Sequence, residues 1–300
     1  MGDSIAGVLV VTERSVSIVI PTYIGTAESR DLLDVQLDAL TRQDYRGKFD
    51  VVIADNGSPI DVRTHIENHP ARNRLKVEWI DASGASGAAF ARNAGADRAS
   101  GEILLFCDHD DRVYPNWVSR MVEFIDEGYD LTCSAVEGDS LNAENPRRVA
   151  AIPAPDKFQP PGVYASVIIG TSMACRAEVY RKLGGQDVSF AANEDLEFGW
   201  RAHREGYRLG YLPEALVAYR YRRGFRPGYR QGRSRGIGLA RLNAEFPGNG
   251  LPEIHLPEVL LRMIRLPFTR GLAAEERGLM IGLAVGQFRG GLRHRTMHWI

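Results

Sequence analysis

Two aspartates separated by one residue, Asp108 and Asp110, follow the short apolar segment 102–107. If that segment is a strand, side chains two positions apart point to the same side, so both carboxylates can face one ligand. Carboxylate oxygens are the ligands that Mg²⁺ and Mn²⁺ prefer, and such an ion could bridge the oxygens of a diphosphate and stabilise it as a leaving group. The alternative is a surface turn whose acids are solvated or cap the next helix.

A second acidic pair, Glu194 and Asp195, follows the glycine turn at 184–185 and begins a predicted helix over residues 195–205. A carboxylate in this place can act as the general base for an attacking hydroxyl. Its alternative role is to cap the helix and interact favourably with the helix dipole. The two roles are compatible, because one carboxylate can serve both.

Polar residues at two further places could hold a nucleotide. Asp55 ends a predicted strand before an Asn-Gly turn, where its carboxylate could accept a hydrogen bond from a base or a ribose, although an Asx turn explains it equally well. The glycine-containing loop 84–87 could approach a phosphate closely, and it leads to Arg92 and Asn93, which could supply a cation and an amide to that phosphate. Its spacing matches neither the Rossmann nor the P-loop pattern.

The elements that must position these side chains alternate between strand and helix. Predicted strands lie at 16–20, 49–54, 75–80 and 102–107, and helical patterns lie between them. Such alternation predicts a mostly parallel sheet, which binds its ligands beyond the carboxyl ends of the strands. Three polar clusters fall at those ends: Thr22-Tyr23, Asp55-Asn56 and 108–111.

Two later segments have a composition typical of loops. Residues 136–163 are rich in proline, asparagine and charge, and predict a long irregular excursion of the kind used as a lid or binding loop. Residues 220–241 contain eight arginines and no acid. Because glycines recur within this segment, we expect a mobile loop that closes over donor phosphates or an anionic acceptor, in preference to a solvated charged face.

The composition is that of an ordinary globular protein, with 44% hydrophobic and 25% charged residues among 300. A net charge of −1 argues against nucleic acid as a partner. The three cysteines are too few for a disulfide framework or a zinc site. The N-terminal apolar run lacks a basic region and is interrupted at Glu13-Arg14, so we expect a cytoplasmic protein without an export signal.

Taken in order, these motifs resemble the inverting glycosyltransferases of family 2. The resemblance covers about residues 15–220 and implies a GT-A type α/β fold, with a Rossmann-like, mostly parallel central sheet flanked by helices. It implies a catalytic domain over 1–222, divided into a nucleotide-binding half (about 15–112) and an acceptor half (113–222). Residues 223–300 would form the arginine-rich loop and a mainly helical C-terminal extension. The matching residues are 16–23, 52–58, Gly87, 91–93, 105–111, 184–185, 194–195, 200–201, 206–207 and 212–215.

The resemblance also implies roles for individual residues. Asp110 would be the main metal ligand, Asp108 would contact the ribose and the metal, and Asp195 would be the catalytic base, with Glu194 as the second candidate. The donor would be a nucleotide-sugar, with a UDP-sugar favoured, the acceptor a saccharide or a lipid-linked saccharide, and the cofactor Mn²⁺ or Mg²⁺. The residues implied to bind the donor are Pro21, Thr22, Tyr23, Asp55, Gly87, Arg92 and Asn93.

The chain departs from the family pattern in one place. Many relatives carry a histidine metal ligand shortly after the Pro-Glu-Ala turn, whereas residues 217–221 contain none. Arg220 or Arg222 could contact the diphosphate instead, which leaves the metal requirement open. The missing histidine allows one alternative, a non-catalytic protein that binds nucleotide-sugars. A second alternative, a sugar-1-phosphate nucleotidyltransferase, shares the nucleotide-binding architecture. The second would need a glycine-rich loop with Arg and Lys directly after the first strand, where this chain has Pro21-Thr22-Tyr23.

The segment 257–295 mixes apolar residues with arginines in helical patterns. Glycines such as Gly282 and Gly286 favour helices that pack closely on the rest of the protein. The alternative is a basic amphipathic helix on a membrane surface, at its inner face, which a lipid-linked acceptor would favour.

Overall fold

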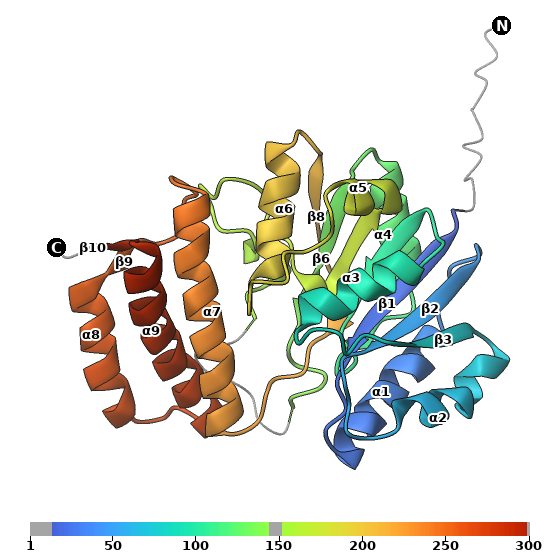
Figure 1. Cartoon of the computed structure of the whole chain (residues 1–300), viewed down its shortest axis with the longest axis horizontal. Helices are drawn as coiled ribbons and strands as arrows, with labels where there is room; N and C mark the ends of the chain where they lie inside the picture. The colour runs from blue at the N-terminus through green and yellow to red at the C-terminus, as the bar shows by residue number, and fades with distance from the viewer. Residues whose placement is uncertain (1–13, 144–151, 299–300) are drawn as a thin grey trace, which may run out of the picture.

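The computed structural model describes residues 14–143 and 152–298, whose main element is an eight-stranded sheet in the order β3-β2-β1-β4-β7-β6-β8-β5 (Figure 1). Strands β1 to β4 pair in parallel, as do β6 and β8, whereas β7 is antiparallel to both of its neighbours and β5 to β8. The strands are β1 (Val16–Thr22), β2 (Phe49–Asp55), β3 (Lys76–Asp81), β4 (Ile103–Phe106), β5 (Arg112–Val113), β6 (Leu131–Glu137), β7 (Met173–Arg176) and β8 (Leu209–Ala218).

Helices cover both faces of this sheet, because its central strands are apolar on both sides. Ile18 and Ile20 belong to the same hydrophobic cluster as the buried residues of α1 and α4, whereas Val19 packs in the cluster formed with α3, α5 and α6. This division follows from the two-residue period of a strand. The helices are α1 (Ala27–Leu40), α2 (Val62–Glu67), α3 (Ala88–Arg98), α4 (Trp117–Asp126), α5 (Ala177–Lys182) and α6 (Glu194–Arg204).

The strand register brings the polar strand ends to one edge. Thr22 pairs with Asp55, and Asp55 pairs with Asp81, so β1, β2 and β3 end level with one another. Strand β4 lies beside β1 in parallel and ends at Phe106, after which the chain enters the turn 107–111. The predicted α/β fold and its four N-terminal strands are therefore confirmed.

Several strands of the sheet lie outside the sequence prediction, including β5, β6 and β8. β6 and β8 form adjacent parallel strands, and β8 contains Pro213. A proline lacks the N–H that a sheet interior needs, and this weakens the strand signal. The register shifts between Ser134 and Ala135, opposite this proline, so an irregularity accommodates it. The predicted excursion 136–163 begins after Glu137, and its residues 144–151 lie outside the described chain.

The arginine-rich segment is a helix, which corrects the mobile loop that we expected there. α7 spans Phe225–Glu245, and its glycines at 228, 232 and 236 recur every four residues along one buried face. A Cβ built on Gly232 would lie 2.0 Å from the backbone oxygen of Leu279, so no other residue fits this contact. The glycines therefore allow close helix packing, and they do not make the segment flexible.

The partner of α7 is α9 (Ala274–His294), whose glycines at 278, 282 and 286 face the α7 backbone. The C-terminal glycines therefore allow close packing, as expected, but the partner of Gly278, Gly282 and Gly286 is α7 and not the sheet domain. α8 (Leu256–Arg265), followed by the short helix η4 (Leu266–Phe268), packs on α9 and is the outermost element in Figure 1. The small parallel pair β9 (Ile254–His255) and β10 (Met297–His298) joins the ends of this layer.

Candidate active site

Three carboxylates gather in the turn that follows β4. Asp108, Asp110 and Asp111 each place one oxygen within 4.8 Å of the other two. Asp108 and Asp110 were predicted from the sequence, but Asp111, whose exposed fraction is only 1%, was not. Oxygen donors of this kind, at this spacing, suit a hard divalent cation such as Mg²⁺ or Mn²⁺.

Asp108 is held in its ionised form by the protein. Burial alone would raise its pKa, but the guanidinium of Arg92 and the hydroxyl of Thr171 outweigh burial and hold the pKa below the usual value. Arg92 Nη2 lies 2.9 Å from Asp108 Oδ1, and Thr171 Oγ1 lies 2.9 Å from Asp108 Oδ2. Both carboxylate oxygens therefore already have partners.

Asp111 lies deeper and in a less favourable environment. Burial, together with the neighbouring charges of Asp110 and Asp108, raises the pKa of this carboxyl well above its usual range. It accepts hydrogen bonds from the Thr171 hydroxyl and, at 2.7 Å, from the backbone N–H of Arg220. The ionised form of Asp111 is therefore disfavoured here, and a bound cation would favour it.

Arg92 connects the acidic turn to the start of α6. Its guanidinium is 2.8 Å from Glu194 Oε1 through Nη1, and its side chain is only 5% exposed. Burial lowers the pKa of an arginine, but Asp108 and Glu194 outweigh burial and raise it, so Arg92 carries a permanent charge between two acids. Its predicted contact with the donor stays a prediction. The contacts that Arg92 makes inside the protein indicate a role in positioning Asp108 and Glu194.

Asn93, the other residue predicted beside the phosphates, is occupied by internal contacts. Its amide donates to the backbone oxygen of Gln186 at 2.8 Å, and its oxygen accepts from Gln186 N–H and the Tyr180 hydroxyl. These bonds join α3 to the chain after α5. Asn93 thus helps to place Arg92 against its partners.

The acidic pair at α6 divides into two environments. Asn193 is the N-cap residue, in the left-handed conformation with φ of 66°, so Glu194 and Asp195 are the first two residues inside the helix. Glu194 pairs with Arg92, and burial together with Asp195 raises its pKa. Asp195 Oδ2 accepts the N–H of Gly170 at 2.7 Å, and its Oδ1 accepts the N–H of Leu196.

The short helix η3 (Gly170–Ser172) makes a second connection between the acidic groups. Gly170 donates its N–H to Asp195, and the next residue, Thr171, donates its hydroxyl to Asp108 and is also bonded to Asp111. Neither residue was among the predicted site residues. Their role depends on contacts across 25 to 63 positions of sequence, which no local pattern encodes.

The predicted nucleoside-binding residues lie together at the ends of β1 and β2. Pro21 and Thr22 are buried in β1, whereas Tyr23 is 56% exposed directly after it. The Asp55 carboxylate accepts bonds from Ser58 and from Trp79 Nε1 at 3.2 Å, which agrees with the Asx-turn alternative.

Gly87 is the N-cap residue of α3 and has φ of 123°, a backbone conformation that favours glycine. Its N–H donates to the side-chain oxygen of Asn56 at 2.8 Å. That bond holds the loop 84–87 against the end of β2.

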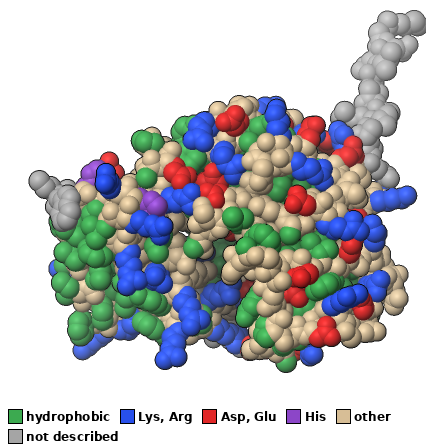
Figure 2. All heavy atoms as spheres, viewed as in Figure 1, with side chains coloured by type: hydrophobic (Ala, Val, Ile, Leu, Met, Phe, Trp, Pro, Cys, Tyr) green, Lys and Arg blue, Asp and Glu red, His purple; other side chains and the backbone are tan. Residues whose placement is uncertain are grey.

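The two arginines proposed to replace the missing histidine both lie at the acidic turn. Arg220 donates from Nε to the backbone oxygen of Asp110 at 3.0 Å. Arg222 Nη2 lies 3.8 Å from Asp110 Oδ2, and this side chain is 56% exposed. In Figure 2, a hollow with Lys or Arg side chains at its rim lies between the sheet domain and the C-terminal helices.

A family model described as glycosyl transferase family 2 matches residues 17–184, more than half of the chain. The chain belongs to glycosyl transferase family 2. A second model, glycosyl transferase family group 2, matches residues 156–286. The acidic turn lies in the first region, and Asp195 and α7 lie in the second, so the candidate site of this family 2 chain draws on both.

Two sequence relatives illustrate this membership. The pre-mycofactocin glycosyltransferase of Mycobacterium tuberculosis (strain CDC 1551 / Oshkosh) is 25% identical over 270 residues, which cover 87% of this chain and 54% of the relative. Validoxylamine A glucosyltransferase of Streptomyces hygroscopicus subsp. limoneus is 30% identical over 224 residues, 63% of this chain and 48% of the relative. The chain therefore spans about half the length of these curated relatives.

Solved structures show that the family 2 chain has the GT-A fold. The mannosyltransferase PcManGT of Pyrobaculum calidifontis, in complex with GDP-Man and Mn²⁺, superposes with a TM-score of 0.59 at 19% identity, covering 95% of this chain and 73% of that one. S. aureus TarS 1-349 in complex with UDP-GlcNAc gives a TM-score of 0.57 at 19% identity and covers 92% of both chains.

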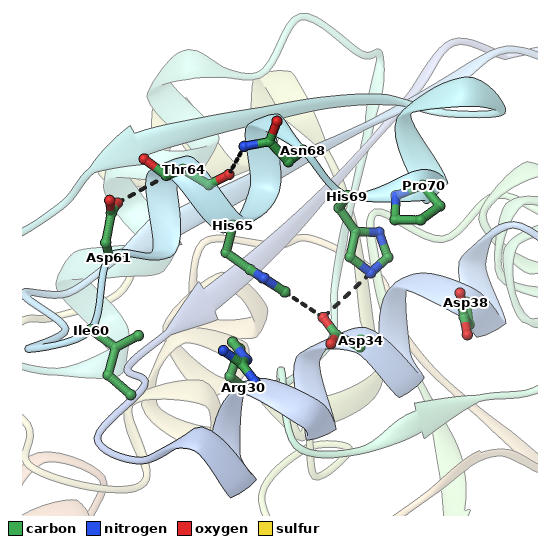
Figure 3. Close-up of a pocket in the computed structure, with 10 residues that line it drawn as sticks. All are labelled: Arg30, Asp34, Asp38, Ile60, Asp61, Thr64, His65, Asn68, His69 and Pro70. Atoms are coloured by element: carbon green, nitrogen blue, oxygen red, sulfur yellow. Dashed lines mark hydrogen bonds and ion pairs between the residues drawn. The ribbon is translucent and has the colours of Figure 1, made fainter.

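A second group of metal-binding residue types lies on the outer side of α1, in a pocket of about 740 Å³ (Figure 3). Asp34 Oδ1 lies 2.5 Å from His65 Nε2 and 3.3 Å from His69 Nε2. However, His69 Nδ1 accepts the N–H of Ala71, so the ring proton of neutral His69 is on Nε2 and points to Asp34. In this tautomer His69 has no lone pair for a metal, and the group is a hydrogen-bond network that joins α1 to the 65–71 segment.

Proposed function

We propose that this chain transfers a sugar from a nucleotide-sugar donor to an acceptor hydroxyl, with inversion at the anomeric carbon. The observation that carries the proposal is the double connection between the acidic turn and the start of α6. Arg92 bridges Asp108 and Glu194, and residues 170–171 bridge Asp195 to Asp108 and Asp111. A group that activates an acceptor and a group that holds a diphosphate are thus fixed relative to each other.

Asp195 is the proposed base. Its two bonds from backbone N–H groups orient the carboxylate while leaving lone pairs on both oxygens. The acceptor hydroxyl gives its proton to Asp195, its oxygen forms the new bond to the anomeric carbon, and the bond from that carbon to the diphosphate oxygen breaks with its electrons on the diphosphate. Glu194 is less suited to this task, because its carboxylate is paired with Arg92.

Asp108 and Asp110, with Asp111 behind them, would hold Mn²⁺ or Mg²⁺. When bound there, the ion would stabilise negative charge on the departing nucleoside diphosphate. Arg222, near Asp110, is positioned to contribute a second positive charge to the same oxygens. We therefore expect stimulation by a divalent ion, and full turnover in excess chelator would contradict it.

We propose a UDP-sugar as donor and a saccharide or lipid-linked saccharide as acceptor. The residues proposed to bind the donor are Pro21, Thr22, Tyr23, Asp55, Gly87, Arg92 and Asn93. Support for the donor class comes from the solved relatives, since TarS is described with UDP-GlcNAc and PcManGT with GDP-Man. The catalytic unit would span residues 1–222, with the helical extension 223–300 flanking it.

The experiment that tests this function begins with a thermal-shift panel of UDP-, GDP-, dTDP- and CDP-sugars, each with and without Mn²⁺. A ligand at about 100 times its Kd stabilises the folded state by about 2.7 kcal/mol, which is readily measured. The stabilising donor is then incubated with a panel of saccharide acceptors, and nucleoside diphosphate release is followed. Stabilisation by no nucleotide-sugar would contradict the proposal.

A further inference from the structure

The outer face of α8 and η4 carries an apolar stripe that no described residue covers. Four of the ten exposed large hydrophobic side chains in the described part of the chain fall within residues 260–268. They are Leu260 at 42%, Leu261 at 45%, Ile264 at 66% and Phe268 at 82% exposure. Figure 2 shows hydrophobic side chains gathered over this outer edge of the molecule.

The stripe is distinct from the side of α8 that packs on the protein. Val259 and Leu266 are buried, and Val259 belongs to a hydrophobic cluster with Ala284 of α9. With 3.6 residues per turn, positions 260, 261 and 264 lie on adjacent turns beside this buried face. The helix is therefore apolar over two neighbouring faces, and only one of them packs against the rest of the protein.

Basic side chains border the stripe. Arg265 and Arg270 are exposed, and among the described residues neither is within ion-pair distance of an acid. The one acid within α8, Glu258, is 2.9 Å from Arg262. An apolar stripe with unneutralised arginines beside it complements a surface in which negatively charged groups cover an apolar layer.

The backbone around Phe268 is tied to α9. The guanidinium of Arg277 donates to the backbone oxygens of Pro267 and Thr269, on either side of Phe268. Because η4 is already ordered, insertion of Phe268 into an apolar layer would cost little conformational entropy. A ten-residue helix is about 15 Å long, too short to cross a bilayer, so it would lie in the plane of the interface. None of the described helices has both the length and the hydrophobicity to span a membrane.

We propose that the α8–η4 stripe docks this chain on a bilayer that contains anionic lipids. Leu260, Leu261, Ile264 and Phe268 would enter the boundary between headgroups and acyl chains, and Arg265 and Arg270 would contact lipid phosphates. The interaction needs neither the nucleotide-sugar nor the acceptor, so it can be tested separately from the proposed transferase activity.

The experiment is co-sedimentation of the full chain with vesicles, without donor or acceptor. One set is phosphatidylcholine alone, and the other is equal parts of phosphatidylcholine and phosphatidylglycerol. We expect the wild type to bind the anionic vesicles. The double variant Ile264→Asn/Phe268→Ser should lose at least about tenfold in vesicle partitioning. The variant Arg265→Ser/Arg270→Ser should lose about fivefold in partitioning per arginine at low salt.

Val188→Asn is the matched control, because Val188 is 49% exposed on another part of the surface. It should bind as the wild type does, and circular dichroism should show all variants folded. Failure of the wild type to bind anionic vesicles would overturn the proposal, as would undiminished binding by the Ile264/Phe268 variant. A lipid-free dimer in sedimentation velocity that this variant converts to monomer would also overturn it and assign the stripe to a second copy.

Discussion

Arg92 is a buried cation between two acids that lie 86 positions apart in sequence, Asp108 and Glu194. A buried ion pair is not strongly stabilising in itself, because both charges lose their hydration. Removal of one partner is nevertheless costly, since the remaining charge stays buried without compensation. Arg92 thus makes the geometry of the candidate site and the stability of the fold depend on the same contacts.

Replacement of Arg92 should therefore destabilise the whole protein. We expect Arg92→Met to lower the free energy of unfolding by about 3–5 kcal/mol, measured by urea denaturation. The matched control is Arg98→Met on the same helix, because Arg98 forms a surface pair with Glu78 and is 57% exposed. The control should lose less than about 1 kcal/mol. Equal losses for the two variants would contradict the role assigned to Arg92.

Thr171 offers a second test at the residue scale. Its single hydroxyl hydrogen lies between Asp108 and Asp111, so Thr171→Val should remove hydrogen bonding from this acidic pair and cost about 1–3 kcal/mol of stability. Thr132→Val is the control, because the Thr132 hydroxyl is buried without a partner in the described structure. Its replacement should be neutral or stabilising. If thermal unfolding shows that Thr132→Val is less stable than Thr171→Val, the hydrogen bonds of Thr171 do not stabilise the protein as proposed.

The sequence predicted part of this site. Asp108, Asp110, Glu194 and Asp195 could be selected because strand ends and helix starts have local signatures. Thr171 and Gly170 could not, since their importance comes only from the contacts that the fold creates. Asp111 was missed because its sequence neighbours do not distinguish a buried carboxylate from a solvated one.

At the scale of elements, the contact between α7 and α9 depends on glycine. Gly228, Gly232 and Gly236 allow the two helix backbones to meet, where a Cβ would collide with backbone oxygens. Glycine in a helix normally lowers stability relative to alanine, and here the close packing of the two helices offsets that loss.

We expect Gly232→Ala to destabilise the protein by about 1–3 kcal/mol, despite the better helix propensity of alanine. The measurement is the midpoint of thermal unfolding. Gly25→Ala is the control, because a Cβ there would meet only the Tyr23 ring at an ordinary 3.5 Å. A stabilised Gly232→Ala variant would show that the helices do not pack as closely as described.

The elements differ in how well the sequence predicted them. β1 to β4 were predicted because their apolar runs end in clear turn signals. β8 was missed because Pro213 interrupts its pattern, and α7 was mistaken for a loop because glycine every four residues looks like flexibility until its packing partner is known. The packing partner, α9, lies about fifty residues further along the chain, so no local sequence pattern predicts the contact.

At the scale of the whole molecule, the C-terminal helices and the sheet domain share a hydrophobic cluster. Trp200 and Leu196 of α6 pack with Leu242 of α7 and Phe246 after it, and Arg241 pairs with Asp187 at 2.7 Å. α6, which carries Asp195, therefore packs between the sheet and α7. This hydrophobic cluster includes residues on both sides of the boundary proposed at residue 222.

This shared core predicts cooperative unfolding. Calorimetry should show one transition for the full chain, with the van't Hoff and calorimetric enthalpies in agreement. Two separate transitions would mean that residues 223–298 form an independent unit, and that the site does not depend on their packing.

The central claim is that Asp195 is the base of a glycosyl transfer whose leaving group is held at the acidic turn. The most direct measurement compares turnover and donor affinity of Asp195→Asn with those of the wild type and of Asp31→Asn, a control whose side chain is 66% exposed on α1. We predict that Asp195→Asn loses about 10²- to 10⁴-fold in kcat with donor Kd nearly unchanged, and that Asp31→Asn behaves as wild type. Wild-type turnover by Asp195→Asn, or equal losses of turnover and donor binding, would contradict the account.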